Sequence, residues 1–291
     1  PFGASTNIRL VVNKKTIGRS MLQPKILLTQ TGECNTACVT DVLIHPKFRS
    51  NPANFINLTK ASENISKFDS VYHTSNEHTE PFYSKLFKYP QPFSLKGYGF
   101  PLRFSNLFFK FSNIRLKILD WLTSPFYWVV SLIASIVITA SKINFSEQLP
   151  SDEMLNKLWF KSILKSGPIF IRNRAYLKWR LIDAPKWAAK VYTVESKGSF
   201  IGYVATRKFK LNGIIFLVVI DFLFNTDINI FERIVLRLWL LKQAIKLNVD
   251  ALFSMINPES KVSRVCIGFP MLPIPDKFLP HATPVFFRTK D

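Results

Sequence analysis

Cysteine is scarce in this chain, which has only Cys34, Cys38 and Cys266 among its 291 residues. Three cysteines cannot build the disulfide framework of a small secreted domain, so a reducing, cytoplasmic environment fits best. Cys34 and Cys38 lie four residues apart, but neither a histidine nor a second cysteine pair completes a zinc-binding set. The histidines show no metal-ligand spacing either, and we therefore expect no metal cofactor.

Several familiar motifs are also missing. The Walker A loop, the glycine-rich Rossmann signature and the Ser-His-Asp pattern do not occur in the sequence. The sequence therefore does not indicate any of the nucleotide-binding or hydrolase classes that these motifs identify. The sequence begins at Pro1 and not at a methionine, so we expect that residues preceding Pro1 are missing from it.

Acidic residues are few, with 19 against 39 basic residues and a formal net charge of +20. This excess favours an acidic partner: a nucleic acid, an anionic lipid or a phosphorylated cofactor. A solvated basic surface explains it equally well. Because no lysine-rich run or RNA-binding signature is present, nucleic acid is the least favoured of these partners.

What the chain does contain is enough apolar residues, 47%, to build sizeable cores. The clearest pattern begins with a β-rich run at Ile214–Phe224, which is typical of a strand covered on both faces. After a polar loop at 225–229, apolar residues recur at helical spacing from Ile230, and Asn229 with Glu232 fits a capping box. A second strand follows at Ala251–Ile256. This order predicts a βαβ unit with a parallel strand pair, whose loop before the helix can bind an anion.

The remaining elements predict two halves of similar organisation. In the first half we expect strands at 8–12, 16–22, 25–30, 37–44 and 71–73, and helices at 53–65 and from 75 to about 89. In the second half we expect helices at 151–164 and 258–267, a hairpin at 190–195 and 200–209, and a closing strand at 282–288. Each half is expected to form its own mixed sheet with helices on both sides.

The first half resembles the GNAT acyltransferase family in its order of hairpin, strand, loop, helix, strand, helix and strand. The segment 42–49 is similar to that family's central strand and the entry to its pyrophosphate loop. Asn76 and the residues around Tyr83 are similar to its later helix motif, and the second half repeats the pattern. The segment 176–180, Tyr-Leu-Lys-Trp-Arg, resembles a motif of GNAT-like proteins related to cell-envelope polysaccharide and peptidoglycan enzymes.

The resemblance implies acetyl-CoA or another acyl-CoA as co-substrate, with its pyrophosphate held by backbone amides after the central strand. The family's loop has Arg or Gln, two residues, a glycine, one residue, and Gly or Ala. Here Arg49 matches, whereas Pro52 stands in place of the glycine and has no N–H group. The implied cofactor-binding residues are Arg49, Ser50, Asn51, Ala53, Asn54 and Asn76.

The resemblance also implies catalytic residues. Tyr83 lies where many GNAT enzymes keep a tyrosine that protonates the leaving thiolate, as a phenol can do; it could equally pack the helix. Asn76 could hydrogen-bond CoA or cap its own helix. His45 could deprotonate an amine acceptor, although its place before Pro46 at a strand end fits turn geometry as well.

Asp221 interrupts an otherwise apolar strand. A buried carboxylate is costly unless it is paired. Two interpretations carry equal weight: Asp221 orients an acceptor amine, or it pairs with Arg172, Arg174 or Arg180.

An uncharged run of 21 residues, 121–141, lies between the halves. It has the length of a membrane span but contains Pro125 and six Ser or Thr residues. We expect a mostly helical connector, which is either a buried or interdomain helix joining the halves or a helix embedded in a membrane or lying on its surface. The chain is thus predicted to be an α/β protein with GNAT-like domains at 1–112 and 146–291, joined by a linker at 113–145.

Three functions compete on this reading. The first is N-acyl transfer from acyl-CoA to a small-molecule or sugar amine, with a cell-envelope precursor as a candidate acceptor. The second is a non-catalytic GNAT-like module that binds a partner or a membrane, and the third is a basic nucleic-acid binder. We expect any CoA site to lie at the 49–54 loop, because Asp227 in the 225–229 loop repels a pyrophosphate.

Overall fold

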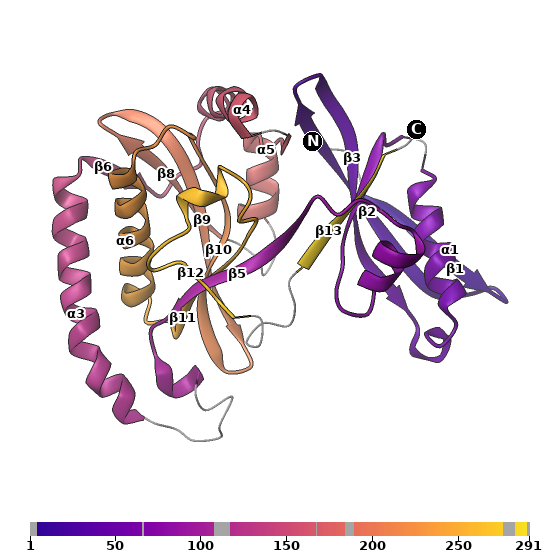
Figure 1. Cartoon of the computed structure of the whole chain (residues 1–291), viewed down its shortest axis with the longest axis horizontal. Coiled ribbons are helices and arrows are strands. Elements are labelled where there is room, and N and C mark those ends of the chain that lie inside the picture. Colours follow the sequence, from indigo (N-terminus) through magenta and orange to yellow (C-terminus); the bar gives the residue numbers. More distant parts are fainter. Residues whose placement is uncertain are drawn as a thin grey trace. The chain divides into compact units, whose positions relative to one another are not determined.

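A computed structural model describes residues 5–65, 67–107, 117–166, 168–183, 189–275 and 283–289. The chain forms two compact units of mixed α/β structure (Figure 1). The first unit consists of Pro1–Leu95, Gly167–Ile171 and His281–Asp291, and the second of Lys96–Ser166 and Arg172–Pro280.

The first unit contains a mixed sheet with the strand order β1-β2-β3-β4-β13-β5. Its strands are β1 (Thr6–Val12), β2 (Lys15–Thr29), β3 (Gly32–Ile44), β4 (Ser70–Thr74), β13 (Thr283–Thr289) and the start of β5 (Phe93–Pro101), with β7 (Ile169–Phe170) paired to β2. Among the described strands of this unit, only β3 and β4 run parallel. The predicted hairpin is confirmed, because β1 and β2 pair antiparallel around Asn13 and Lys14.

Helix α1 (Pro52–Glu63) connects the parallel pair of this unit and packs against β1, β2 and β3. Asn51 caps it, and its buried positions, Phe55, Leu58, Thr59, Ser62 and Glu63, follow the three-four spacing of one face. Two short elements flank it: a 3₁₀ turn at Pro46–Phe48 before the helix, and a π-helical turn at Phe82–Leu86 after β4.

The second unit contains a sheet with the order β5-β11-β10-β9-β8-β6, and β12 pairs with β5. Its strands are β6 (Ile143–Ser146), β8 (Lys190–Ser196), β9 (Ser199–Leu211), β10 (Ile214–Phe224), β11 (Ala251–Ile256) and β12 (Leu272–Pro273). Its helices are α3 (Lys117–Ala140), α4 (Asp152–Ser166), α5 (Arg174–Leu177) and α6 (Ile230–Lys246), with helical turns at Lys178–Ile182 and Ser263–Val265. The predicted βαβ unit is confirmed: β10 and β11 are parallel and α6 connects them.

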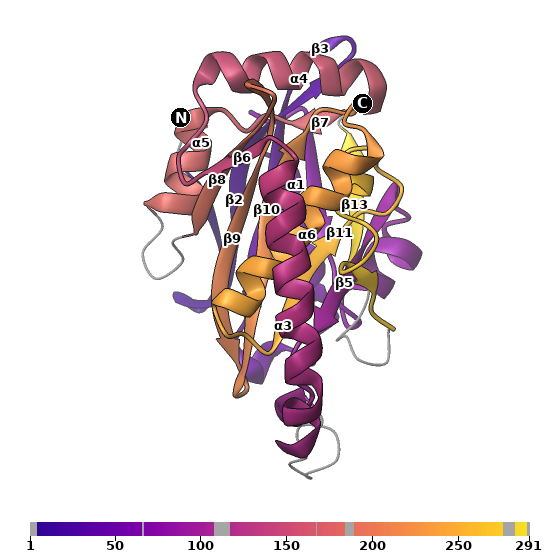
Figure 2. The same ribbon diagram turned by 90° about the vertical axis from the view of Figure 1, so that its left-hand side faces the viewer.

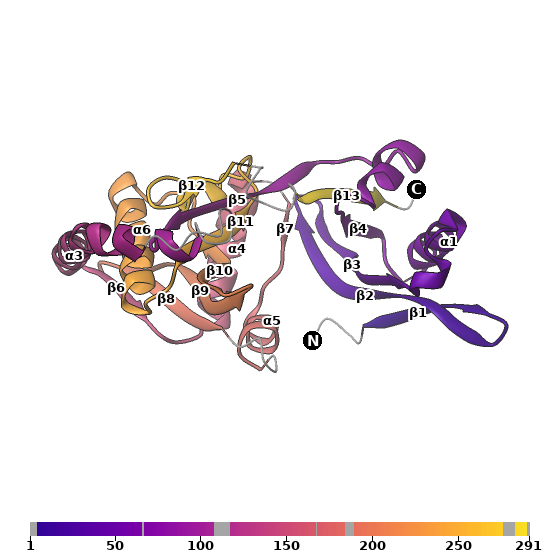
Figure 3. The ribbon, with the colours of Figure 1, turned by 90° about the horizontal axis from the view of Figure 1, so that it is seen from below.

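The helices of the second unit form layers around its sheet. Figures 1 and 2 show α3 running alongside α6, and α6 lies between α3 and the sheet. Seen from below, α5 lies on the other side of the same sheet (Figure 3). The helix predicted for 121–141 is therefore present, and it continues through Pro125.

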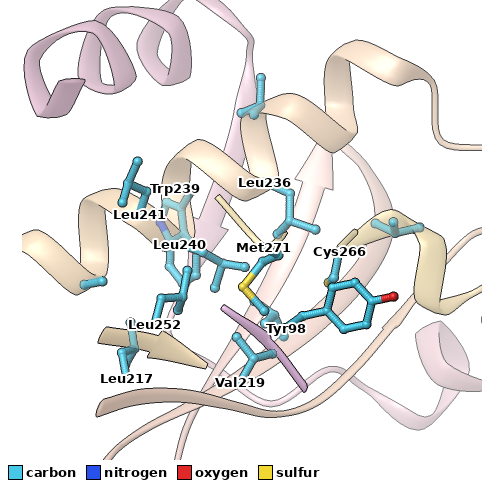
Figure 4. Close-up of a cluster of buried hydrophobic side chains, with 14 of the residues drawn as sticks. Tyr98, Leu217, Val219, Leu236, Trp239, Leu240, Leu241, Leu252, Cys266 and Met271 are labelled. Atoms are coloured by element: carbon cyan, nitrogen blue, oxygen red, sulfur yellow. The ribbon is translucent and has the colours of Figure 1, made fainter. Parts of the chain in front are cut away.

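The largest core fills the space between α6 and the sheet (Figure 4). Helix α6 contributes Leu236, Trp239 and Leu240, all 5% exposed or less, and the strands contribute Leu217 and Leu252. The Trp239 ring stacks on Phe145 with centroids 4.5 Å apart and meets Tyr192 edge-on at 4.7 Å. These contacts fix the crossover helix on its sheet.

Four expectations about organisation differ from the structure. Strand β5 takes part in both sheets, since Phe93–Leu95 pair with β13 and Lys96–Pro101 pair with β11, so the sheets are not separate at this strand. The closing strand pairs in the first unit, between β4 and β5, and not in the second half. Helix α3 lies inside the second unit and not in a linker between domains at 113–145. The helix expected at 258–267 is only the short turn Ser263–Val265.

The stability of the second unit should depend strongly on Trp239. Replacing this buried ring with alanine removes its packing and leaves a cavity, so we expect Trp239→Ala to lower the free energy of unfolding by about 3–5 kcal/mol. Denaturant titration followed by circular dichroism measures the loss. Trp179, which is 54% exposed, is the matched control, and Trp179→Ala should cost under about 1 kcal/mol. Equal losses in the two variants would contradict this account of the core.

Candidate functional site

The two units repeat one arrangement around their parallel strands. In the first unit, β3 and β4 pair only over Thr36–Val39 and Ser70–His73. In the second, β10 and β11 pair only over Phe216–Val218 and Ala251–Phe253, although β10 continues to Phe224. Within the described part of the chain, each central strand thus runs on beyond its parallel neighbour.

A bulge marks each central strand just past its parallel pairing. In β10 the register against β9 shifts between Val219 and Asp221, so Ile220 is the extra residue. In β3 the extra residue lies between Thr40 and Leu43, where Asp41 takes a left-handed backbone conformation with φ of 51°. Bulges re-aim a strand and interrupt its pairing, and they are common next to binding sites. The strand edge beyond each bulge can pair with an extended ligand.

The loop after β3 carries the predicted cofactor residues. Arg49 is exposed, and its Nε donates a hydrogen bond to the carbonyl oxygen of Ile44 at 2.8 Å, which fixes its side chain beside the end of the strand. Ser50 and Ala53 are exposed, and the Asn54 side chain donates to the carbonyl oxygen of Phe48 at 2.9 Å. The loop therefore presents a basic, solvent-facing surface.

Backbone donors at the start of α1 are already engaged. Pro52 is the first helical residue and has no N–H, while the Asn51 side chain accepts from the Ala53 N–H at 3.0 Å. The Asn54 N–H donates to the carbonyl oxygen of Asn51 at 3.2 Å. Asn51 is therefore a helix cap, and an anion here has to replace that cap.

The corresponding loop of the second unit is also capped by an asparagine, but it carries acidic residues. The Asn229 side chain accepts from the Glu232 N–H at 2.9 Å, and the Glu232 carboxylate accepts from the Asn229 N–H at 3.0 Å. This is the predicted capping box, and it is confirmed. Asp227 lies exposed in the same loop. Two carboxylates at this helix N-terminus disfavour a bound anion.

Asp221 follows the bulge of β10 and is paired. Its Oδ2 lies 3.2 Å from Nε of Arg172 and accepts a hydrogen bond from the Tyr203 hydroxyl at 3.4 Å. Tyr203 is fully buried, and that burial, together with the Asp221 charge, raises the pKa of its hydroxyl well above the usual range. Of the partners expected for Asp221, the structure brings Arg172 to it; a role in orienting an amine stays a prediction.

His45 and Asn76 both cap turns. Nδ1 of His45 accepts a hydrogen bond from the Lys47 N–H at 3.3 Å, at the start of the 3₁₀ turn. That contact engages Nδ1 with the backbone, and a role for His45 in deprotonating an amine stays a prediction. The Asn76 Oδ1 accepts from the backbone N–H groups of His78 and Thr79, each at 3.1 Å. Both residues thus have the turn-forming roles that were expected as alternatives.

Tyr83 is buried among aromatic rings. Its side chain is 3% exposed, and its ring centroid lies 4.5 Å from that of His73, 5.5 Å from Phe286 and 5.9 Å from Phe55. Burial is the main cause of the raised pKa of its hydroxyl, which stays protonated at neutral pH. The packing alternative is confirmed by these contacts, and a role as proton donor stays a prediction.

Next to Tyr83 lies a buried polar network that the sequence did not reveal. The Glu63 carboxylate has one oxygen 3.1 Å from Nε2 of His73, and its other oxygen accepts from the Tyr89 hydroxyl at 2.5 Å and from Arg288 at 2.9 Å. The side chains of Glu63 and His73 are at most 1% exposed. The sequence offered one sign of this network, which is the position of Glu63 on the apolar face of α1.

The network controls the ionisation of Glu63. Burial alone raises the pKa of this carboxyl, but the adjacent His73 ring and the hydrogen bonds from Tyr89 and Arg288 outweigh it. The pKa of Glu63 is therefore lower than usual, and the group is ionised at neutral pH. Among the described residues no cluster of His, Cys, Asp or Glu is arranged to hold a metal ion.

Solved structures of acyltransferases resemble the whole chain. Yeast (Saccharomyces cerevisiae) N-myristoyltransferase, solved with myristoyl-CoA and inhibitors, matches with a TM-score of 0.61 and 12% identity, covering 97% of this chain and 67% of that one. A GCN5-related N-acetyltransferase from Anabaena variabilis gives 0.59 and 11%, covering 97% and 62%. Another from Kribbella flavida gives 0.57 and 7%, covering 97% and 59%.

These likenesses confirm the expected GNAT-like fold. At such low identity they show the fold alone, and the chain spans only about three-fifths to two-thirds of the length of these proteins. No family profile matches the sequence, and no curated protein matches it.

The lowered pKa of Glu63 predicts how stability depends on pH. Because the unfolded chain binds a proton at Glu63 more readily, the ion network stabilises the fold above the unfolded pKa of about 4.3, and this stabilisation is lost as pH falls through the lower folded pKa. We expect Glu63→Gln to lower the free energy of unfolding at pH 7 by about 1–3 kcal/mol. The difference from the unmodified protein should shrink in acid. Denaturant titrations across this range measure it.

Glu33 is exposed on β3 and provides the control. Glu33→Gln should leave both the stability at pH 7 and its acid dependence almost unchanged. A Glu63→Gln variant that loses the same free energy at every pH would show that packing, and not ionisation, accounts for the effect.

Proposed function

We propose that this chain, which has the GNAT-like fold, transfers an acyl group from an acyl-CoA to an amine. The observation that carries the proposal is the central strand of each unit, which passes a bulge and continues beyond its parallel partner. An open strand edge can pair with an extended chain of amides, and the pantetheine arm of CoA is such a chain. The resemblance to acyltransferases solved with acyl-CoA supports the same ligand.

Charge favours the loop of the first unit for the CoA pyrophosphate. Arg49 and Lys47 are both exposed there, and no acidic residue occurs between 47 and 54. The corresponding loop in the second unit presents Asp227 and Glu232. A close opposite charge is worth about 1 kcal/mol or more at a partly buried site, and a like charge costs as much. The missing N–H of Pro52 and the Asn51 cap reduce the affinity without reversing this preference.

The proposed reaction is a direct attack. The amine nitrogen bonds to the thioester carbonyl carbon, the bond from that carbon to sulfur breaks, and the acceptor loses one proton while the CoA thiolate gains one. Backbone N–H groups at the strand edge stabilise the oxyanion. Tyr83 is the proposed proton donor to the thiolate, because its hydroxyl stays protonated and a phenol can act as a general acid.

The acceptor is proposed to be an amine on a sugar or cell-envelope precursor. Its support is the segment 176–180, in which Tyr176 and Leu177 are buried while Trp179 and Arg180 are exposed. An exposed aromatic ring beside a cation suits a polar sugar ring. Amino sugars are therefore the first acceptors to test.

A second candidate function is a GNAT-like module that binds a partner without catalysis. The capped starts of α1 and α6 favour it, because the Asn51 and Asn229 side chains occupy backbone N–H groups that a pyrophosphate needs. Binding of CoA separates the two candidates.

Isothermal calorimetry with acetyl-CoA and the intact protein tests the binding step. We expect measurable binding, weakened about tenfold or more by Arg49→Glu, because that change replaces an attractive charge with a repulsive one. Asp227→Lys should leave the affinity unchanged. Arg9 is exposed on β1, so Arg9→Glu makes the same charge change away from the loop and should have no effect.

Two results would contradict this assignment. If Arg49→Glu binds as well as the unmodified protein while Asp227→Lys binds more tightly, the pyrophosphate lies in the second unit. If neither acetyl-CoA nor a long-chain acyl-CoA binds, the non-catalytic function replaces the proposed one.

Release of free CoA thiol in the presence of a panel of amines, including amino sugars, tests the chemistry. We expect Tyr83→Phe to keep acyl-CoA binding and to lower kcat by roughly 10²-fold or more, since it removes only the proposed general acid. Tyr98→Phe makes the same change at a buried tyrosine of the second unit and should keep kcat. Unchanged turnover in Tyr83→Phe would leave Tyr83 with a packing role only.

A further inference from the structure

Helix α3 has an unusual composition for a helix at the surface of a folded unit. Its 21-residue segment Asp120–Ala140 is long and apolar enough to cross a membrane, and an 18-residue window within it has a mean hydropathy of 1.7. Only 6% of that window is buried. Such a helix is ordinarily either the core helix of a soluble protein or in contact with lipid. Among the described residues, too little covers this segment for it to be the core helix of a soluble protein.

One face of α3 is fixed to the second unit. Tyr127, Val130, Val137 and Ile138 pack against the core around α6, and Ala134 is fully buried. The Tyr127 hydroxyl also donates a hydrogen bond to the carbonyl oxygen of Pro101 at 3.1 Å. Figure 2 shows α3 lying along α6. This packing excludes lipid from one side, so α3 is not a lone transmembrane helix in this structure.

The opposite face is also apolar and has no cover among the described residues. Trp121 is 73% exposed, Trp128 68% and Ile136 61%. The other large apolar side chains exposed on α3 are Ile118, Leu122, Phe126, Val129, Leu132 and Ile133. Soluble monomers rarely expose so continuous an apolar surface, and such surfaces mark protein or membrane contacts. We call these nine residues the outer face of α3.

The charges around the helix favour a membrane over a protein partner. No charged residue occurs from 121 to 141, and the Asp120 carboxylate accepts hydrogen bonds from the backbone N–H and hydroxyl of Ser105. Directly after the helix, exposed Lys142 and Lys197 are joined by a backbone hydrogen bond. A net charge of +20 adds attraction to an anionic surface. Tryptophans at positions 121 and 128 are the aromatic residue preferred at a membrane interface.

We propose that the outer face of α3 docks this chain on an anionic membrane, with the helix axis in the plane of the interface. The tryptophans and aliphatic side chains enter the boundary between headgroups and acyl chains, while the inner face stays on α6. The proposal is independent of acyl transfer, because it rests on no residue of either candidate loop.

Vesicle flotation tests the docking. The intact protein should float with vesicles of phosphatidylcholine and phosphatidylglycerol and remain at the bottom with phosphatidylcholine alone. A Leu132→Glu and Ile136→Glu double variant should reduce the floated fraction by about tenfold or more, because it places two charges in the apolar boundary. Phe160 is 67% exposed on α4, so Phe160→Glu is the matched control and should float normally.

A second measurement begins with the unmodified protein, and its first result does not depend on the folding of a variant. Lipids brominated near the headgroup end of the acyl chain should quench the fluorescence of Trp121 and Trp128. Replacing both by phenylalanine should remove most of that quenching, because the other four tryptophans of the chain lie outside α3.

Three outcomes would overturn the proposal. The first is an absence of both flotation and quenching with anionic vesicles. The second is equal flotation with neutral vesicles, which removes the role of charge. The third is a dimer in solution, seen by analytical ultracentrifugation, that the α3 double variant dissociates while no vesicle binding occurs; the outer face then joins two copies of the chain.

Discussion

The short parallel pairing of two strands is the constraint on which the second unit depends. Parallel neighbours cannot be joined by a tight turn, so a crossover must leave the sheet, cover its face and return. Helix α6 makes that crossover and carries the buried positions that hold it on the sheet. It also provides the surface on which α3 rests. The pairing between β10 and β11 therefore determines the position of two helices and of the loop that precedes α6.

The same constraint places a helix N-terminus next to the end of a central strand in each unit, and there two uses of one set of N–H groups compete. A side-chain cap stabilises the helix in the absence of a ligand, whereas a bound anion needs the same donors. Asn51 and Asn229 occupy these donors in the two units. The difference between the loops is therefore one of charge, with Arg49 in one and Asp227 in the other.

The parts of the fold that follow from local pattern could be predicted from the sequence. Helix α6 and its capping box are encoded by Asn229, Glu232 and the apolar spacing that follows, and α3 by its uncharged run. The location of β13 could not be predicted, because strand pairing between distant segments leaves no local signal. Asp221 was recognised as a carboxylate needing a partner, and Arg172 was one of three candidates. The partners of Glu63, His73 and Arg288, come from two other strands, so no spacing connects them.

The position of β13 has a consequence for folding during synthesis. This strand lies between β4 and β5 and supplies Phe286 to the aromatic core and Arg288 to Glu63. The first unit thus lacks an inner strand until residues 283–289 have been synthesised, although most of its other strands are made much earlier. Every strand of the second unit is complete before then. The first unit therefore begins to be synthesised before the second, but its sheet can be completed only after the sheet of the second unit. Until β13 is made, no strand joins β4 to β5.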